Sequence, residues 1–174
     1  MNRLILKLSF AVLLAGLCLD AAAQAPAFRN KGYKGNIGIE TFQVFPGITT
    51  SHGYMFNSHH YLGGGFTTNV APYSKDANLF ITPFIEYQAY ILDKNSTPVV
   101  GGKILSFARI PFDSEEHIRF LNGFAIAPQF GWSWGIGSQK QFGIMPYISA
   151  ELFLEFAHGL HFYPMPAIGV VFEF

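Results

Sequence analysis

The C-terminal stretch, residues 163–174, reads YPMPAIGVVFEF and indicates how the rest of the chain is folded. Bulky apolar residues recur at every second position, with small residues and one glutamate between them. The two sides of an extended chain would carry Ile168, Val170, Phe172 and Phe174 against Ala167, Gly169, Val171 and Glu173. A period of two is typical of a β-strand. Such a strand needs partners on both edges, because an unpaired edge promotes aggregation.

The composition favours a protein whose surface does not face water alone. The chain has 174 residues, which suits one domain, and only 13% of them are charged while 17% are aromatic. A soluble domain carries about 25% charged residues, whereas a surface in contact with lipid needs far fewer. The formal net charge is zero, which argues against nucleic acid as a partner.

The first 25 residues predict a secretory signal peptide that is removed. Arg3 and Lys7 precede the apolar run LSFAVLLAGLCL, and the small residues AAAQA follow it. Cleavage is expected after Ala23 or Ala25. The apolar run is too short for a membrane-spanning helix.

Cysteine chemistry is expected to be absent from the mature chain. Cys18 is the one cysteine of the sequence and lies within this leader. The residue before it is Leu17, where a lipoprotein signal needs a small residue. The mature chain should therefore form no disulfide, and no metal site or nucleophile should depend on a cysteine.

The remainder divides into a polar lead-in, expected at the periplasmic side over residues 26–34, and a strand-rich domain over 35–174. Runs rich in β-branched and aromatic residues alternate with clusters of turn residues. A tilted strand needs about 9–11 residues to cross a membrane, and each run is long enough. The eight runs are 35–45, 49–57, 60–70, 79–91, 97–108, 119–135, 141–155 and 161–174.

The runs carry large apolar residues on one side and small or polar residues on the other. Over 119–135 the apolar side has Phe120, Phe124, Ile126, Phe130, Trp132 and Trp134, against Gly123, Ala125, Ala127, Gln129, Gly131 and Ser133. Small and polar sides that carry glutamate suit a narrow interior, so the apolar sides should face lipid. The predicted fold is therefore all-β: an eight-stranded antiparallel up-and-down transmembrane β-barrel, apolar outside, with a filled polar lumen.

Connection lengths agree with this orientation. Short turns, expected at the periplasmic end, are predicted at 58–59, 92–96 and 136–140, and longer external loops at 71–78, 109–118 and 156–160. The first external turn is predicted at 46–47 and is short. The loop 109–118 carries Asp113, Glu115 and Glu116, which makes it the expected contact surface for an external partner.

Glycine and aromatic patterns give the chain a family resemblance. They are GYMFN at 53–57, YLGGGF at 61–66, TPFIEY at 82–87, PVVGGK at 98–103 and the terminal Phe174. With these patterns, residues 30–174 resemble the small outer-membrane β-barrel domain family of Gram-negative bacteria, a porin-like family of eight-stranded barrels. The resemblance implies location in the cell envelope, contact with outer-membrane lipid, and assembly by the barrel-insertion machinery. Phe172 and Phe174 would form the terminal insertion signal. It implies no shared reaction.

Five charged residues are the candidates for a network in the lumen: Glu40, Glu86, Lys103, Glu151 and Glu173. Alternation directs the four glutamates inward. Ring closure is expected to bring Glu40 near Glu173. An eight-stranded barrel has an interior that side chains fill, so a plug of paired side chains is expected rather than a proton or ion path.

The orientation of Lys103 is less direct. It shares its side with Leu105 and Phe107, so it would need a β-bulge to turn inward. If it does, it is expected to pair with Glu86 on the neighbouring strand.

Outward-facing aromatic residues are expected to anchor the barrel at the lipid headgroups rather than to stack on a ligand. The candidates are Tyr54, Tyr87, Trp132 and Trp134.

No motif for catalysis, a cofactor or a metal is found. The six histidines lack the spacing that zinc sites use. Ser51 and His52 are adjacent, and adjacent residues of a strand point to opposite sides, so they do not form a nucleophile–base pair.

The sequence therefore predicts a non-enzymatic and monomeric integral outer-membrane protein. Its role would be structural, or surface interaction through the external loops. The alternatives are a lipid-modifying hydrolase or acyltransferase on the same fold, and a soluble lipocalin-like carrier. A pore for small solutes is disfavoured, because side chains should block the lumen.

Overall fold

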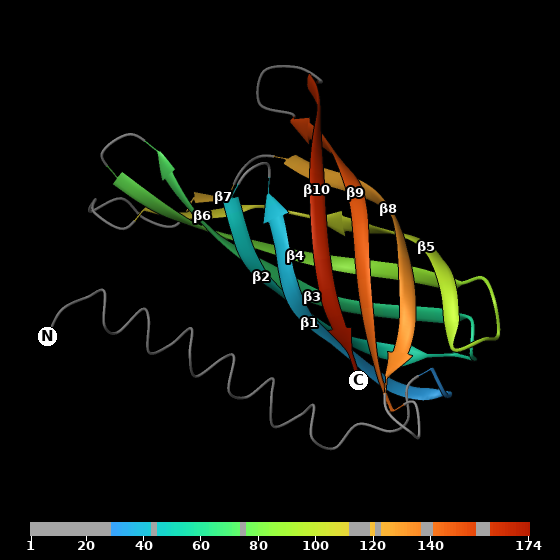
Figure 1. The fold of residues 1–174 in the computed structure, drawn as a ribbon. Coiled ribbons are helices and arrows are strands. Elements are labelled where there is room, and N and C mark those ends of the chain that lie inside the picture. The colour runs from blue at the N-terminus through green and yellow to red at the C-terminus, as the bar shows by residue number, and fades with distance from the viewer. Residues whose placement is uncertain are drawn as a thin grey trace, which may run out of the picture.

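The chain forms a closed, eight-stranded antiparallel β-barrel in the computed structural model (Figure 1). The structure describes residues 29–42, 45–73, 76–111, 119–120, 123–136, 141–155 and 161–174. These residues contain no helix, and so none that could cross a membrane. Their strands are β1 (Gly32–Phe42), β2 (Phe45–Met55), β3 (His60–Tyr73), β4 (Asp76–Tyr90), β5 (Ser96–Leu105), β6 (Ala108–Pro111), β7 (Arg119–Phe120), β8 (Gly123–Ile136), β9 (Phe142–Glu155) and β10 (His161–Glu173).

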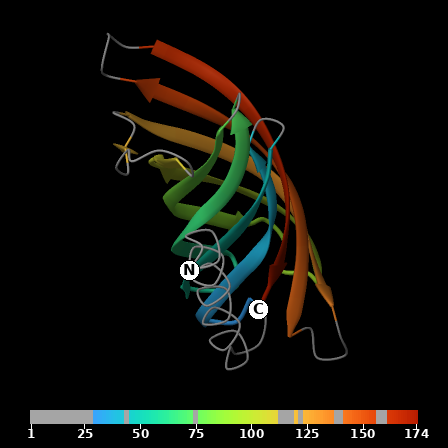
Figure 2. The ribbon, with the colours of Figure 1, turned by 90° about the vertical axis from the view of Figure 1, so that its left-hand side faces the viewer.

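Each of the eight barrel strands pairs with its two neighbours, and β1 pairs with β10 to close the ring. Around the ring the order is β1, β2, β3, β4, β5, β8, β9 and β10. The short strands β6 and β7 are continuations of β5 and β8 and add no positions to the ring. β6 continues the ladder with β4 and then pairs with β7. Figures 1 and 2 show the strands inclined and wound around a common axis. The predicted all-β, eight-stranded antiparallel barrel is thus confirmed.

The first hairpin differs from the sequence prediction at both ends. β1 begins at Gly32, three residues before the expected start, so the lead-in is shorter than predicted. The hairpin turns between Phe42 and Phe45 rather than at 46–47, and Pro46 pairs with Thr41 inside the ladder. Proline and glycine usually indicate turns, but proline is tolerated near the start of a strand. Gly47 leaves room for the side-chain amide of Asn69, which a Cβ atom there would approach at 2.2 Å.

The predicted loop 71–78 is also wrong, because most of it is strand. The β3–β4 ladder continues to the pair Tyr73 and Asp76. The prediction rested on the cluster of turn residues in this stretch, but the backbone pairing of β3 with β4 includes several of them. The start of the predicted loop 109–118 is strand as well, since β6 ends at Pro111. Residues 112–118, 137–140 and 156–160 lie outside the described residues.

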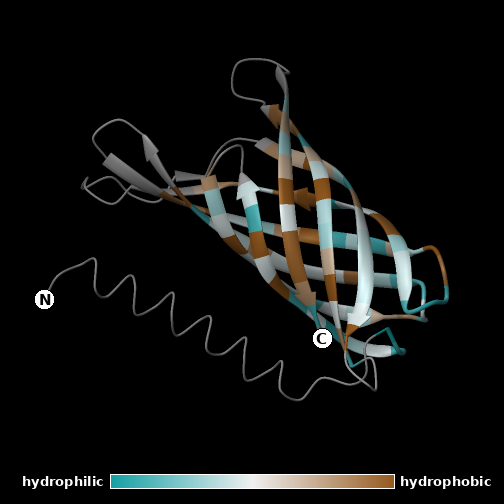
Figure 3. Cartoon of the chain, in the orientation of Figure 1, coloured by the Kyte–Doolittle hydropathy of each residue, from teal (hydrophilic) through white to brown (hydrophobic). Residues whose placement is uncertain are grey.

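Hydropathy alternates along the strands, as Figure 3 shows. The interior is filled by buried polar side chains and two apolar clusters. One cluster is Met55, Tyr61, Tyr90, Val99, Met145, Tyr147 and Val171. The other is Phe84, Leu105, Phe107, Ala125 and Ala127, with Phe153 packed against it. Large aliphatic side chains are exposed on the outside.

We predict that Gly38→Ala weakens the closure of the ring, whereas Gly102→Ala is tolerated. A Cβ atom at Gly38 would lie 2.1 Å from the carbonyl oxygen of Val170, so β1 and β10 would have to separate. At Gly102 the nearest atom is 3.4 Å away, an ordinary contact. The Gly38 variant should lose about 1–3 kcal/mol of unfolding free energy in a urea titration. Equal stability of the two variants would contradict this packing.

Candidate functional site

The lumen next to the chain's C-terminal end holds an ion pair between Lys34 and Glu173. Lys34 Nζ lies 2.7 Å from Glu173 Oε1, and both side chains are buried. Tyr90 accepts a hydrogen bond from Lys34 and donates one to Glu173 Oε1 at 2.5 Å. Ser133 donates to the other carboxylate oxygen. Buried charges are tolerated when they are paired and hydrogen-bonded, and this pair is both.

A second ion pair joins Lys103 to Glu40, further along the lumen. Lys103 Nζ and the Tyr147 hydroxyl both donate to Glu40 Oε2. The ammonium also lies 4.6 Å from the centroid of the Phe84 ring. A desolvated cation over an aromatic face gains further electrostatic stabilisation.

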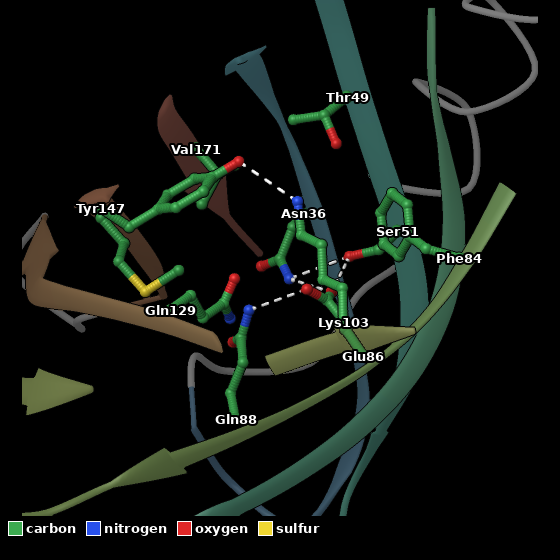
Figure 4. Close-up of a pocket in the computed structure, with 11 residues that line it drawn as sticks. Asn36, Thr49, Ser51, Phe84, Glu86, Gln88, Lys103, Gln129, Tyr147 and Val171 are labelled. Atoms are coloured by element: carbon green, nitrogen blue, oxygen red, sulfur yellow. Dashed lines mark hydrogen bonds between the residues drawn. The ribbon is translucent and has the colours of Figure 1, made fainter. Parts of the chain in front are cut away.

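Glu86 lies between these pairs and is held by neutral donors (Figure 4). Asn36 Nδ2 donates to Oε1 at 3.3 Å, and Gln88 Nε2 donates to Oε2 at 3.1 Å. The Ser51 hydroxyl donates to Oε1 as well. Hydrogen bonds within this group thus satisfy both carboxylate oxygens.

The pairing predicted for Lys103 is therefore wrong. Lys103 and Glu86 are direct backbone partners on β5 and β4, yet the ammonium reaches across the lumen to Glu40. Neutral donors already occupy the oxygens of Glu86. No bulge is needed either, because Lys103, Leu105 and Phe107 all point inward. The inward-facing residues that follow Lys103, namely Leu105 and Phe107, belong to an apolar cluster of the interior.

The predicted proximity of Glu40 and Glu173 is wrong for a geometric reason. Asn36 pairs with Glu173, while Glu40 pairs with Gly169. Four residues along a strand separate the two positions by about 13 Å. Each glutamate instead has its own lysine. Lys34 was missed because it was assigned to the lead-in, although its alternation with Asn36 and Glu40 points to the same face.

Glu151 is the fourth predicted lumen glutamate, and it is buried in β9. Within the described part of the chain, its Oε2 atom has no hydrogen-bond partner. It therefore stands apart from Glu40, Glu86 and Glu173, whose carboxylates are all hydrogen-bonded.

The predicted aromatic anchors Tyr54, Tyr87, Trp132 and Trp134 are all exposed on the outside. Their strand positions lie towards the end of the barrel that holds the C-terminus, since Trp134 pairs with Ser96 at the start of β5. Trp132 Nε1 donates to Ser96 Oγ at 2.7 Å, and the Tyr87 hydroxyl is 2.7 Å from His60 Nδ1.

The two terminal aromatic residues differ from each other. Phe172 is 40% exposed, whereas Phe174 is 3% exposed. The ring of Phe174 covers Gly35, where a Cβ atom would lie 2.3 Å from it. The rings of His52 and Phe172 lie beside it. Phe174 thus packs directly after the end of the closing strand β10 rather than being freely exposed.

Ser51 and His52 point to opposite sides of β2. Ser51 belongs to the lumen group around Glu86, while the His52 ring stacks with Tyr33 at a centroid distance of 6.0 Å. This geometry offers no nucleophile–base pair at these positions. The described residues contain no cluster of three or more side chains suited to a metal. The acidic residues Asp113, Glu115 and Glu116 lie outside the described residues.

Arg29 lies at the mouth of the lumen, beside the turn between β4 and β5. Its guanidinium is 5.6 Å from the centroid of the Tyr90 ring. It donates to the carbonyl oxygens of Leu92 and Lys94. The lead-in thus contacts Tyr90, which belongs to the group around the Lys34–Glu173 ion pair, and no local sequence pattern predicts this contact.

Comparisons with known proteins add a fold relationship. No family model matches the chain, and no curated protein matches it. The chain is similar in structure to the N-terminal β-barrel domain of OprF from Pseudomonas aeruginosa, with a TM-score of 0.55 and 12% identity. The similarity covers 83% of this chain and 98% of that domain. At this identity, the likeness shows the barrel fold alone.

We predict that Lys34→Met destabilises the barrel by about 3–5 kcal/mol, because Glu173 would remain buried without its cation. The double variant Lys34→Met/Glu173→Leu should recover most of this loss, since it removes both charges. Lys31→Met is the matched control, because Lys31 is exposed three residues earlier and should change stability by less than about 0.5 kcal/mol. Urea titration measures all three. A Lys34 variant as stable as the Lys31 variant would contradict the ion-pair assignment.

Proposed function

We propose that the protein is an integral outer-membrane β-barrel of a Gram-negative cell envelope, without enzymatic activity. Its role is structural, or surface interaction through its external loops. The observation that carries the proposal is a belt of isoleucines on the outside of a barrel whose inside holds the buried charged and polar side chains.

The isoleucine belt consists of exposed side chains that the strand register places next to one another. Ile39 pairs with Ile48, Ile85 with Ile104, Ile104 with Ile126, and Ile148 with Ile168. Their exposed fractions run from 43% at Ile126 to 63% at Ile85. Soluble monomers rarely expose contiguous apolar patches of such extent. A soluble lipocalin-like carrier would need the opposite arrangement, with an apolar interior.

The exposed aromatic residues Tyr54, Tyr87, Trp132 and Trp134 support the same proposal. They lie between the isoleucine belt and the end that holds the C-terminus, by strand register. Amphipathic rings favour the headgroup region, so this end would sit at one membrane interface. The signal peptide over residues 1–25 and the insertion signal at Phe172 and Phe174 belong to the same proposal.

The filled lumen supports a structural role over transport. The cavity described inside the barrel is small: the centre of a water molecule can move within only about 10 Å³ of it. Two ion pairs with their hydrogen bonds, and two apolar clusters, fill the interior beside it. A hydrated solute would have to displace them, which is costly in a low-dielectric interior.

The first test is fractionation of cells that express the full chain, followed by electrophoresis with and without boiling. The proposal predicts recovery with outer membranes and a mobility shift on boiling, because a folded barrel resists detergent until it is heated. Recovery in the soluble fraction without a shift would overturn the membrane assignment.

We predict that Ile104→Arg in the middle of the belt destabilises the barrel in lipid vesicles by about 2–4 kcal/mol. The matched control is Leu92→Arg, because Leu92 is exposed in the turn between β4 and β5 and would lie in the interface. The control should cost about 1 kcal/mol or less. Unfolding by urea in vesicles measures both. Equal costs at the two positions would argue against a lipid-facing belt.

The loop role rests on the acidic residues Asp113, Glu115 and Glu116, which stand out in a chain that is poor in charge. Replacing all three with alanine should weaken adhesion of whole cells to a cationic surface, and the weakening should disappear at high salt. The control replaces Asp93 and Lys94 in the turn between β4 and β5, at the opposite end, and should leave adhesion unchanged. If neither variant loses adhesion, this contact surface is removed from the proposal and the structural role remains.

A further inference from the structure

A small cavity lies inside the barrel, lined by the group around Glu86 and by Lys103 and Tyr147, the two donors to Glu40. Polar side chains from opposite walls line it, as Figure 4 shows. The lining residues are Asn36, Thr49, Ser51, Phe84, Glu86, Gln88, Lys103, Gln129, Met145, Tyr147 and Val171.

Two of these residues bring polar atoms that have no hydrogen-bond partner among the described residues. They are Asn36 Oδ1, an acceptor, and Gln129 Nε2, a donor. Both side chains are more than nine-tenths buried. Buried amide groups are almost always satisfied, so two unsatisfied atoms at one cavity point to a missing partner.

We propose that one water molecule occupies this cavity and bridges Asn36 to Gln129. Water can donate to Asn36 Oδ1 and accept from Gln129 Nε2 at the same time, which matches the two unsatisfied atoms. A cavity needs about 10–15 Å³ of this kind of volume to hold one water, and about 10 Å³ is present.

A monovalent cation fits the site less well than water. It would suit Asn36 Oδ1 and the carboxylate of Glu86, but the N–H groups of Gln129 would then face a positive charge. The lysine that lines the same cavity, Lys103, would repel it as well. The polarity of the two free atoms therefore selects a neutral molecule that both donates and accepts.

The bridge has a structural consequence, because Asn36 lies on β1 and Gln129 on β8. These strands are not neighbours in the ring. The water joins the hydrogen-bonded group of Asn36, Ser51, Glu86 and Gln88 to the facing wall. The water thus links β1 to β8 across the lumen through hydrogen bonds to Asn36 and Gln129.

The test is nuclear magnetic resonance of the folded full-length protein in detergent micelles. We expect a cross-peak between water and the side-chain amide of Gln129, with the sign of a long-lived bound water. The side-chain amide of Asn69 is the control, because it is buried and donates to the carbonyl of Phe45. The proposal is overturned if Gln129 shows no such cross-peak.

Two variants of Val171, which lines the cavity without polar atoms, make the test independent of the spectrum. Val171→Ile fills the space and should expel the water. The unfolding equilibrium constant in urea should then rise about tenfold, as expected when two buried polar groups lose their partner. Val171→Ala leaves the space open and should keep the cross-peak.

A dry cavity would give the opposite sign, because Val171→Ile would then fill empty space and leave stability unchanged or higher. A cation site would instead be indicated if sodium stabilised the wild type more than an equal concentration of a bulky organic cation does. Either result would overturn the water assignment. Neither depends on where the barrel resides in the cell.

Discussion

The pairing of β1 with β10 is the constraint on which the rest of the structure depends. Without it, the sheet would have two open edges, and the inside and outside would not be separate surfaces. The seam is fixed on both faces. Inside, Lys34 meets Glu173, and outside, the ring of Phe174 covers Gly35. The backbones of Gly35 and Phe174 also exchange two hydrogen bonds, so the last residue of the chain takes part in closure.

Closure in turn brings interior polar groups from distant strands within reach of one another. An eight-stranded ring leaves only the width of side chains, so buried charges can pair across that width, although Glu151 Oε2 has no partner among the described residues. Lys34 and Lys103 reach Glu173 and Glu40 in this way, while Glu86 collects neutral donors. Tyr90 donates a further hydrogen bond to Glu173, and Tyr147 donates one to Glu40. These partners come from strands far apart in the sequence.

This explains what the sequence could and could not predict. Period-two alternation identifies which residues face inward, because it depends only on the local chain, and it placed Glu86 and Trp132 on opposite surfaces. Partners across the lumen depend on the stagger between strands, which alternation does not contain. Hence Lys103 was expected beside Glu86, its neighbour in the ladder, rather than beside Glu40. Local signals also misled where tertiary pairing prevailed, as at Pro46, which lies in a strand despite its preference for turns.

The inward network and the outward isoleucine belt are two results of one alternation, and their combination is what favours a lipid environment. The two tryptophans of the sequence, Trp132 and Trp134, both lie on the outer side of β8 and can report on that environment without labels. The most direct measurement is quenching of their fluorescence in vesicles of lipids brominated at different depths. A lipid-facing barrel predicts strong quenching by bromines near the headgroup, weaker quenching by bromines near the bilayer centre, and little quenching by aqueous iodide. Efficient quenching by iodide and none by brominated lipid would contradict the account.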